Sequence, residues 1–323
     1  MLERGSVMIK KNAHWISVII TLATVLALLL SGCSNSHAVF GATTPHPVVL
    51  HHITRTIRPQ SSSPKQVAAF MSNNSSNTVI YFDPHPDDEV LTFGVPIRND
   101  LSAGKQVYLV LMSAGEHSIS REVINGRYDR QSVRPSQTGR RVWCKVHHRY
   151  HNPAAEGYPY MTLETFGKSR IQEFIRASLA LGVPYSHLVI YYLPNDHFTH
   201  AAVKRIMLDW IHRYPGATLK TMSAWDVHRD HAMLGRVLDE LYAEGKVWNK
   251  VNYASVATRL KYDHNHWPII RLTHRQDREI LKRALAVYKA WNPKRGEFAL
   301  GYHSVPAQFD FVERHMTSKR VAG

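Results

Sequence analysis

The sequence predicts an α/β fold of the Rossmann-like type, with a mostly parallel sheet and helices on both of its faces. From residue 78 onward, short apolar runs alternate with longer amphipathic stretches. Strands that alternate with helices favour a parallel sheet that is covered on both sides. The chain has 323 residues, of which 44% are hydrophobic, so it can bury a large core and is not a disordered protein.

Four apolar runs are predicted strands and five amphipathic stretches are predicted helices. The strands are 78–82, 107–113, 186–193 and 217–224, and the helices are 96–104, 169–183, 201–214, 231–246 and 273–291. The last helix repeats its apolar side chains with the helical period, as expected for one buried face. Residues 114–160 are less regular and rich in His, Arg and Tyr, so we interpret them as a long insertion or lid.

The N-terminus is predicted to be a lipoprotein signal peptide. Basic residues precede an apolar run, residues 15–30, which has the length of a signal-peptide core and is short for a membrane span. The run ends in Leu-Ser-Gly-Cys, which resembles the lipobox of bacterial lipoproteins and would place lipid on Cys33. We expect residues 1–33 to be signal peptide and lipobox, and the rest to be extracytoplasmic, anchored to the bacterial cell membrane. An uncleaved anchor helix is the alternative.

Composition separates a tether from the folded part. Residues 34–77 are rich in Ser, Pro, Asn and Thr, which is typical of a linker, and residues 78–323 would form the domain. The net charge of +15 suits contact with acidic cell-wall polymers or lipid headgroups. A single basic patch, residues 139–150, does not favour nucleic-acid binding. Cys144 is expected to be a small buried hydrophobe.

Two motifs rich in acids and histidine follow predicted strands directly. PHPDDE, residues 84–89, follows the first strand, and HRDH, residues 228–231, follows the fourth. Functional groups of open parallel sheets gather at the carboxyl ends of the strands. His85 and Asp88 are three residues apart and can point to one spot, where His231 would supply a third ligand. Either motif alone could cap a helix, but together they favour a catalytic zinc site with an open position for water.

The paired motifs resemble those of the PIG-L/LmbE-like zinc de-N-acetylases, which include N-acetylglucosaminyl deacetylases. The resemblance covers about residues 76–291 and implies that His85, Asp88 and His231 hold Zn²⁺. Fe²⁺ or another divalent ion would also suit these ligands. Asp87 would take a proton from the attacking water and return it to the leaving amine.

The resemblance implies further roles. His228 would stabilise the oxyanion as an imidazolium, and Asp230 would hold His228 through its other ring nitrogen. Arg170 and Asp196 match a substrate-contacting arginine and a sugar-contacting aspartate of the family. Trp225 offers either a sugar-stacking face or a core side chain, and we favour the core.

The expected function is removal of an N-acetyl group from an N-acetylglucosamine-type sugar or exported glycan. An amidase acting on another N-acyl sugar conjugate is a second possibility. A lipoprotein that binds glycan without turnover is a third, because Asp226 and Arg229 depart from the residues usual in the second motif. Against this third function, every residue that catalysis needs is present, including Asp87.

Overall fold

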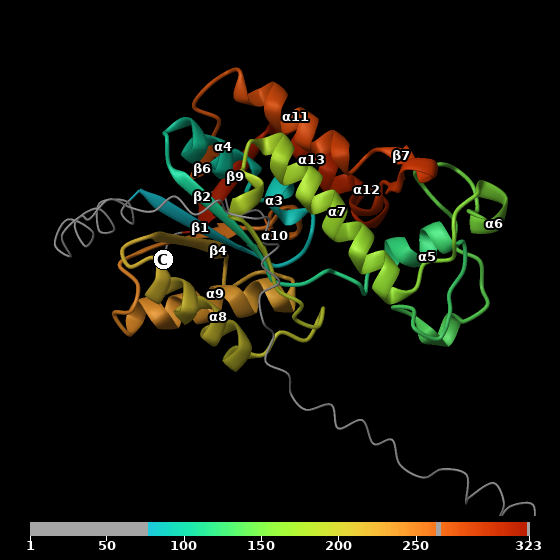
Figure 1. Cartoon of the computed structure of the whole chain (residues 1–323), viewed down its shortest axis with the longest axis horizontal. Coiled ribbons are helices and arrows are strands. Elements are labelled where there is room, and N and C mark those ends of the chain that lie inside the picture. The colour runs from blue at the N-terminus through green and yellow to red at the C-terminus, as the bar shows by residue number, and fades with distance from the viewer. Residues whose placement is uncertain (1–76, 263–265, 322–323) are drawn as a thin grey trace, which may run out of the picture. The chain divides into compact units, whose positions relative to one another are not determined.

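A seven-stranded sheet lies at the centre of the computed structural model, which describes residues 77–262 and 266–321 (Figure 1). The predicted signal peptide and lipobox, residues 1–33, lie outside the described residues, as do residues 34–76 of the predicted tether. Within the described ranges, no helix is long and apolar enough to cross a membrane.

The strands lie in the order β3-β2-β1-β4-β5-β9-β6. Their bounds are β1 Thr78–Asp83, β2 Gln106–Leu111, β3 Leu188–Ile190, β4 Thr218–Met222, β5 Asn249–Ala254, β6 Ile269–Arg271 and β9 Thr317–Val321. Strands β1 to β5 pair in parallel, while β9 runs antiparallel to both β5 and β6. The prediction of a mostly parallel sheet is confirmed. The chain moves from β1 outward to β3 and then returns to place β4 on the other side of β1, which makes β1 and β4 the switch point of the sheet.

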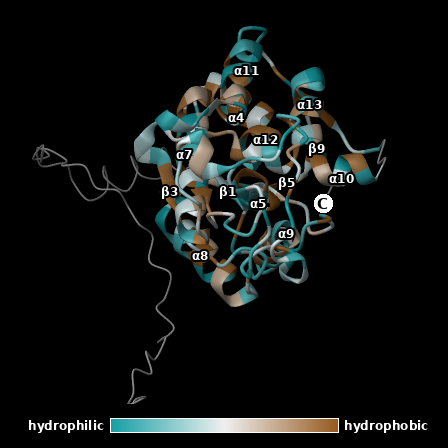
Figure 2. Ribbon diagram, turned by 90° about the vertical axis from the view of Figure 1, so that its right-hand side faces the viewer, coloured by the Kyte–Doolittle hydropathy of each residue, from teal (hydrophilic) through white to brown (hydrophobic). Residues whose placement is uncertain are grey.

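Helices cover both faces of the sheet (Figure 1). The helices of one face are α4 Gly94–Ser102, α7 Leu163–Leu181, α11 Asp277–Val287 and α13 Pro306–His315, and those of the other are α8 His200–Arg213 and α9 Arg229–Ala243. Each face of the sheet has its own hydrophobic core, and alternate residues of β1 contribute to the two cores. Val79 and Tyr81 pack against the first set of helices, and Ile80 and Phe82 pack against the second set. In Figure 2 the helix ribbons carry both hydrophobic and hydrophilic residues, as expected of helices with one buried face.

Most predicted elements occur within a few residues of their expected bounds. Helix α7 begins six residues before the predicted 169–183, because Thr162 and Thr165 cap each other's backbone N–H at its start. Strand β5 was not predicted, since its sequence NKVNYA has no apolar run. Outside the segment 114–160, several other helices and strands were not predicted either: α3 Asp88–Leu91, α10 Val256–Lys261, α12 Leu300–Ser304, α13, β6, β9, and a small hairpin of β7 Trp291–Asn292 and β8 Glu297–Phe298.

The segment 114–160 folds against the C-terminal part of the domain. It holds α5 Ile119–Asn125, α6 Pro153–Glu156 and a short 3-10 turn, and α5 packs on α12. Arg121 organises it from within: this arginine is 1% exposed and donates to both carboxylate oxygens of Asp129, at 2.7 and 2.8 Å, and to Glu122 at 3.1 Å.

Arg121→Met should lower the free energy of unfolding by about 3 kcal/mol, because it leaves Glu122 buried without its cation. Chemical denaturation would measure the change. Lys168→Met is the matched control, because it removes a positive charge from the solvent-exposed ion pair Lys168–Glu164. If both variants are equally stable, the Arg121 cluster does not hold this segment.

Candidate metal centre and active site

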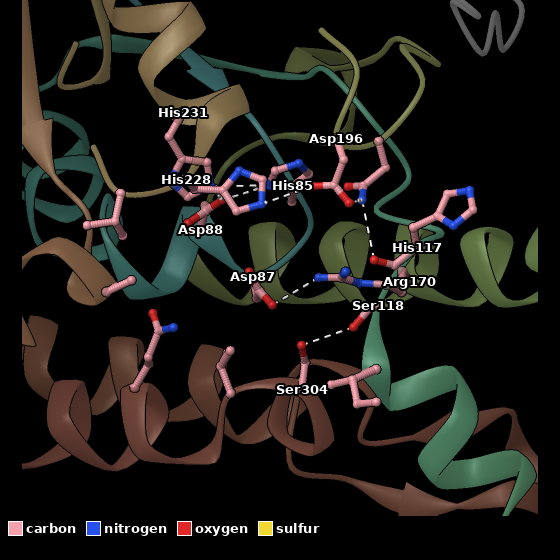
Figure 3. Close-up of a pocket in the computed structure, with 16 residues that line it drawn as sticks. His85, Asp87, Asp88, His117, Ser118, Arg170, Asp196, His228, His231 and Ser304 are labelled. Carbon is pink, nitrogen blue, oxygen red and sulfur yellow. Dashed lines mark hydrogen bonds and ion pairs between the residues drawn. The ribbon is translucent and has the colours of Figure 1, made fainter. Parts of the chain in front are cut away.

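The two predicted motifs meet at the carboxyl ends of β1 and β4, which are hydrogen-bonded neighbours. The loop after β1 supplies His85, Asp87 and Asp88, while the start of α9 supplies His228 and His231. These side chains line one pocket of about 300 Å³ (Figure 3). The switch point of the sheet therefore brings together the metal ligands and the acid predicted from sequence.

Three ligand atoms form a triangle of the size that a zinc ion requires. His85 Nδ1 lies 3.2 Å from His231 Nε2, and Asp88 Oδ2 lies 3.2 Å from His231 Nε2 and 3.7 Å from His85 Nδ1. Ligands at about 2.0–2.1 Å from a tetrahedral zinc lie about 3.3 Å apart. Asp88 Oδ2 is buried and accepts no hydrogen bond of good geometry. The three residues thus fit a divalent cation.

Two further carboxylates orient the imidazoles. Asp230 Oδ2 lies 3.2 Å from His85 Nε2, and Asp226 Oδ1 lies 3.2 Å from His231 Nδ1. Carboxylates in these positions fix the ring orientation and leave the opposite nitrogens for a metal. The predicted pairing of Asp230 with the ring of His228 is therefore wrong, because the carboxylate faces His85 and only the Asp230 backbone N–H donates to His228 Nδ1. From the sequence, Asp226 was noted only as a residue that departs from the usual second motif. Its position beside the ring of His231 was not predicted.

The electrostatics of the triangle require positive charge. Burial raises the pKa of Asp88, but the neighbouring rings of His231 and His85 outweigh it and hold that pKa well below its usual range. Burial lowers the pKa of His231, but Asp88 and Asp226 raise it well above its ordinary value. Protons provide this charge where no cation is bound, and a divalent cation would replace them.

His228 has the opposite character. Burial, together with the charges of His231 and His85, lowers the pKa of His228 to about 3. Without a bound metal, this environment favours the neutral imidazole over the expected imidazolium. Since Nδ1 accepts the Asp230 backbone N–H, a neutral His228 carries its proton on Nε2, which lies 3.3 Å from Asp196 Oδ1. This N–H can donate to a developing oxyanion.

Asp87 occupies a constrained position beside the triangle. Its φ of 111° lies in a region that L-residues rarely adopt, and its backbone N–H donates to Glu89 Oε2 at 2.9 Å. Burial raises the pKa of Asp87 to about 7, although the guanidinium of Arg170 lowers it. A carboxyl group with this pKa can both take and give a proton near neutral pH.

Arg170 clamps the loop around Asp87. Its guanidinium donates to Asp87 Oδ2 at 2.9 Å, to Gly115 O at 3.0 Å and to Pro86 O. A Cβ at Gly115, where φ is +63°, would lie 2.5 Å from Arg170 Nη1, so glycine lets this clamp form. The arginine lines the pocket, and its two terminal nitrogens already donate to protein groups, while its buried Nε has no hydrogen-bond partner among the described residues.

Asp196 lies at the edge of the pocket, half-buried. Its backbone N–H donates to Asp230 Oδ2 at 2.7 Å, so the carboxylate of Asp230 connects Asp196 to His85. Trp225 is 79% exposed and is not a core side chain, contrary to the prediction.

Sequence reasoning missed most of one wall of the pocket. This wall contains His117, which follows the second predicted strand and was an open candidate for the pocket lining. Its other residues come from the segment 114–160 and from the C-terminal helices, and they are Ser118, Ile119, Ser304, Val305 and Gln308. The hydroxyl of Ser118 donates to that of Ser304 at 3.0 Å and joins the two parts (Figure 3). Apart from His117, nothing in the sequence marked these residues as part of the site, because they form no motif.

The fold and the site define an α/β protein with a candidate metal-dependent active site at the switch point of a parallel sheet. Residues 80–242 match the model of the PIG-L family, described as GlcNAc-PI de-N-acetylase, and this match spans half of the chain. The chain belongs to the PIG-L family of de-N-acetylases. No sequence among curated proteins matches it.

Solved structures share the fold. A triple mutant of a deacetylase from the teicoplanin biosynthetic pathway is 14% identical, with 76% of this chain and 98% of that chain covered and a TM-score of 0.50. The N,N'-diacetylchitobiose deacetylase of Pyrococcus horikoshii is 13% identical, with 74% and 86% covered and a TM-score of 0.42. At 14% identity, the likeness to the deacetylase of the teicoplanin pathway shows the fold alone.

Arg170→Gln should raise the pKa of Asp87 above about 7, because it removes the cation that favours the carboxylate. Carboxyl NMR titration of the metal-free protein would measure this pKa, with Asp87→Asn to assign the resonance. Arg176→Gln, on the same helix, should leave the value unchanged. A pKa that is equal in wild type and Arg170→Gln would contradict the role of the clamp.

Proposed function

We propose that this chain is a zinc-dependent deacetylase that removes the N-acetyl group from an N-acetylglucosamine-type sugar of an exported glycan. The observation that carries the proposal is the placement of Asp87 in the same pocket as His85, Asp88 and His231. Membership of the PIG-L family supports amide hydrolysis.

The protein's own residues would divide the reaction between them. His85, Asp88 and His231 would hold Zn²⁺, which when bound supplies a Lewis acid for the amide carbonyl and lowers the pKa of water. Asp87 would accept the proton of the attacking water and deliver it to the departing amine. Arg170 would keep Asp87 in position by its hydrogen bond of 2.9 Å.

His228 would stabilise the oxyanion as a neutral donor. In the free protein, its Nε2 lies 3.3 Å from Asp196 Oδ1. During the reaction, the Nε2–H would instead donate a hydrogen bond to the oxygen of the tetrahedral intermediate. Asp196 would then accept hydrogen bonds from hydroxyl groups of the sugar. A neutral imidazole suits this role because a cation at this point would be repelled by the metal.

The shape of the pocket supports a sugar unit at the end or on the surface of a larger glycan. A volume of about 300 Å³ is at the small end of ligand pockets, so the remainder of a longer substrate would lie outside. Trp225, which is 79% exposed and lies two residues before the pocket residue Val227, would offer that remainder an aromatic face.

Asp87→Asn should lower the turnover of the enzyme by about a hundredfold or more while the protein keeps its metal, because it removes the proton acceptor. Free amine released from N-acetylglucosamine oligomers and cell-wall fragments would be measured, after chelation and after zinc add-back. Asp209→Asn, an exposed residue of α8, is the matched control. Full activity of Asp87→Asn would exclude Asp87 as the base.

His231→Ala should lose both the catalytic metal and all amine release, since it removes one of three ligands. Metal content and activity would be determined on the same preparation. Release of a larger acid in place of acetate would instead indicate an amidase. Glycan binding by the wild type without any metal-dependent product would indicate a binding protein.

We also propose that the protein is anchored outside the cytoplasmic membrane through lipid on Cys33, on the basis of the lipobox-like sequence. Cys33→Ser should move the protein from the membrane fraction to the soluble fraction or leave it with an uncleaved N-terminus. Incorporation of labelled fatty acid into wild type and variant would test this. Equal labelling of both would contradict the proposal.

A further inference from the structure

A second group of metal-binding side chains lies outside the catalytic pocket. Cys144, His147 and His151 come from the segment 114–160, and His303 comes from α12. One ligand atom from each of the four residues lies within 4.8 Å of every other. None of them belongs to the two motifs of the catalytic site.

The distances suit a tetrahedral metal ion. His147 Nδ1 lies 3.1 Å from His151 Nε2 and 3.3 Å from His303 Nε2. Nitrogen ligands of a tetrahedral zinc lie about 3.3 Å apart, given bonds of about 2.0–2.1 Å. The backbone N–H of His147 donates to Cys144 Sγ at 3.2 Å, and such a donor stabilises a thiolate.

The partners of the ring nitrogens fix two of the tautomers. His303 Nδ1 lies 3.0 Å from the carbonyl oxygen of Phe298 and 2.9 Å from that of Ala299. Since a carbonyl oxygen only accepts, His303 Nδ1 carries the proton and Nε2 presents a lone pair. His151 Nδ1 lies 3.0 Å from Glu156 Oε2, so its Nε2 presents a lone pair in the same way.

Without a cation this arrangement is incompletely satisfied. The lone pairs of His151 and His303 both face His147 Nδ1, which carries at most one proton to share between them. A metal ion would satisfy all three nitrogens at once. The contact of His151 with Glu156 is also the carboxylate–histidine arrangement that supports metal ligands.

These residues are buried, and burial disfavours the charged form of the three histidines. Cys144 is fully buried, and His151 and His303 are 3% and 6% exposed. Burial lowers the pKa of His147 and His151, and it lowers that of His303 to about 4, with the two neighbouring histidines contributing. A neutral imidazole is the form that binds a metal ion.

We propose that Cys144, His147, His151 and His303 bind a structural zinc ion. One thiolate and three imidazoles fill all four tetrahedral positions, which leaves no position for substrate and is typical of a structural site. The Cys144 thiolate and the Glu156 carboxylate would balance the charge of Zn²⁺. The ring of Trp291 lies 4.7 Å from those of His147 and His151, centroid to centroid, and covers the cluster.

This zinc would secure one wall of the catalytic pocket. His303 precedes Ser304 and Val305, which line that pocket. The start of the same helix is held by Glu173, whose carboxylate accepts the backbone N–H of Leu300 at 2.8 Å. At the C-terminal end of α12, the ion would join this helix to the segment 114–160. Loss of the ion should therefore affect stability and KM more than kcat.

Metal analysis of the full-length protein provides the first test. Wild type should hold about two zinc ions per chain, and His231→Ala, Cys144→Ser and His303→Ala should each hold about one. Cys144→Ser and His303→Ala should also lower the Tm of the zinc-loaded protein. Because His231→Ala lacks the proposed catalytic metal, its remaining zinc reports the structural site whether or not the enzyme is a deacetylase.

Cobalt substitution provides a test that needs no destabilised variant. Co²⁺ bound to a thiolate has a sulfur-to-metal charge-transfer band in the near ultraviolet, and the catalytic site contains no cysteine. The band should be present in wild type, in His231→Ala and in Cys33→Ser, which removes the other cysteine of the chain. Wild-type protein that binds one metal ion per chain and shows no such band would overturn the proposal, even if the Cys144 variant fails to fold.

Discussion

The parallel pairing of β1 with β4 is the constraint on which the catalytic site depends. These strands are far apart in sequence, but they are neighbours because the chain first adds β2 and β3 on one side of β1 and then returns to the other. Their carboxyl ends therefore present two loops to the same point. A histidine and two aspartates from one loop and two histidines from the other meet there, with distances near those of a metal site.

Charge compensation explains why so many acids can be buried at this point. Asp88, Asp226 and Asp230 face the rings of His85 and His231, while Arg170 faces Asp87. Two further acids, Asp83 and Glu89, form no ion pair with a cation among the described residues. Burial raises the pKa of Asp83 and of Glu89 well above their ordinary values, and Glu89 accepts a hydrogen bond of 2.7 Å from Tyr288. A bound cation would compensate only part of the acidic motif.

The segment 114–160 is more than a cover over the site. Its first residues line the catalytic pocket, and its later residues contribute three of the four side chains of the Cys-His cluster. The fourth, His303, comes from α12, which contributes Ser304 to the same wall of the pocket. A single structural ion would thus hold both sides of that wall, which explains how a segment with little regular secondary structure can support a catalytic surface.

The sequence by itself determined the alternation of strands and helices. It also indicated the parallel sheet, because a continuous apolar run such as 78–82 is typical of a strand that is buried on both faces. It also determined the ligands His85, Asp88 and His231 as candidates, because each motif follows a strand directly. The partners of the histidines were decided only by the tertiary structure. Asp230 faces His85, and Asp226 faces His231, because their orientation depends on where α9 meets the loop after β1. The pocket wall and the Cys-His cluster were decided in the same way, since residues 144 and 303 become neighbours only when α12 packs on α5.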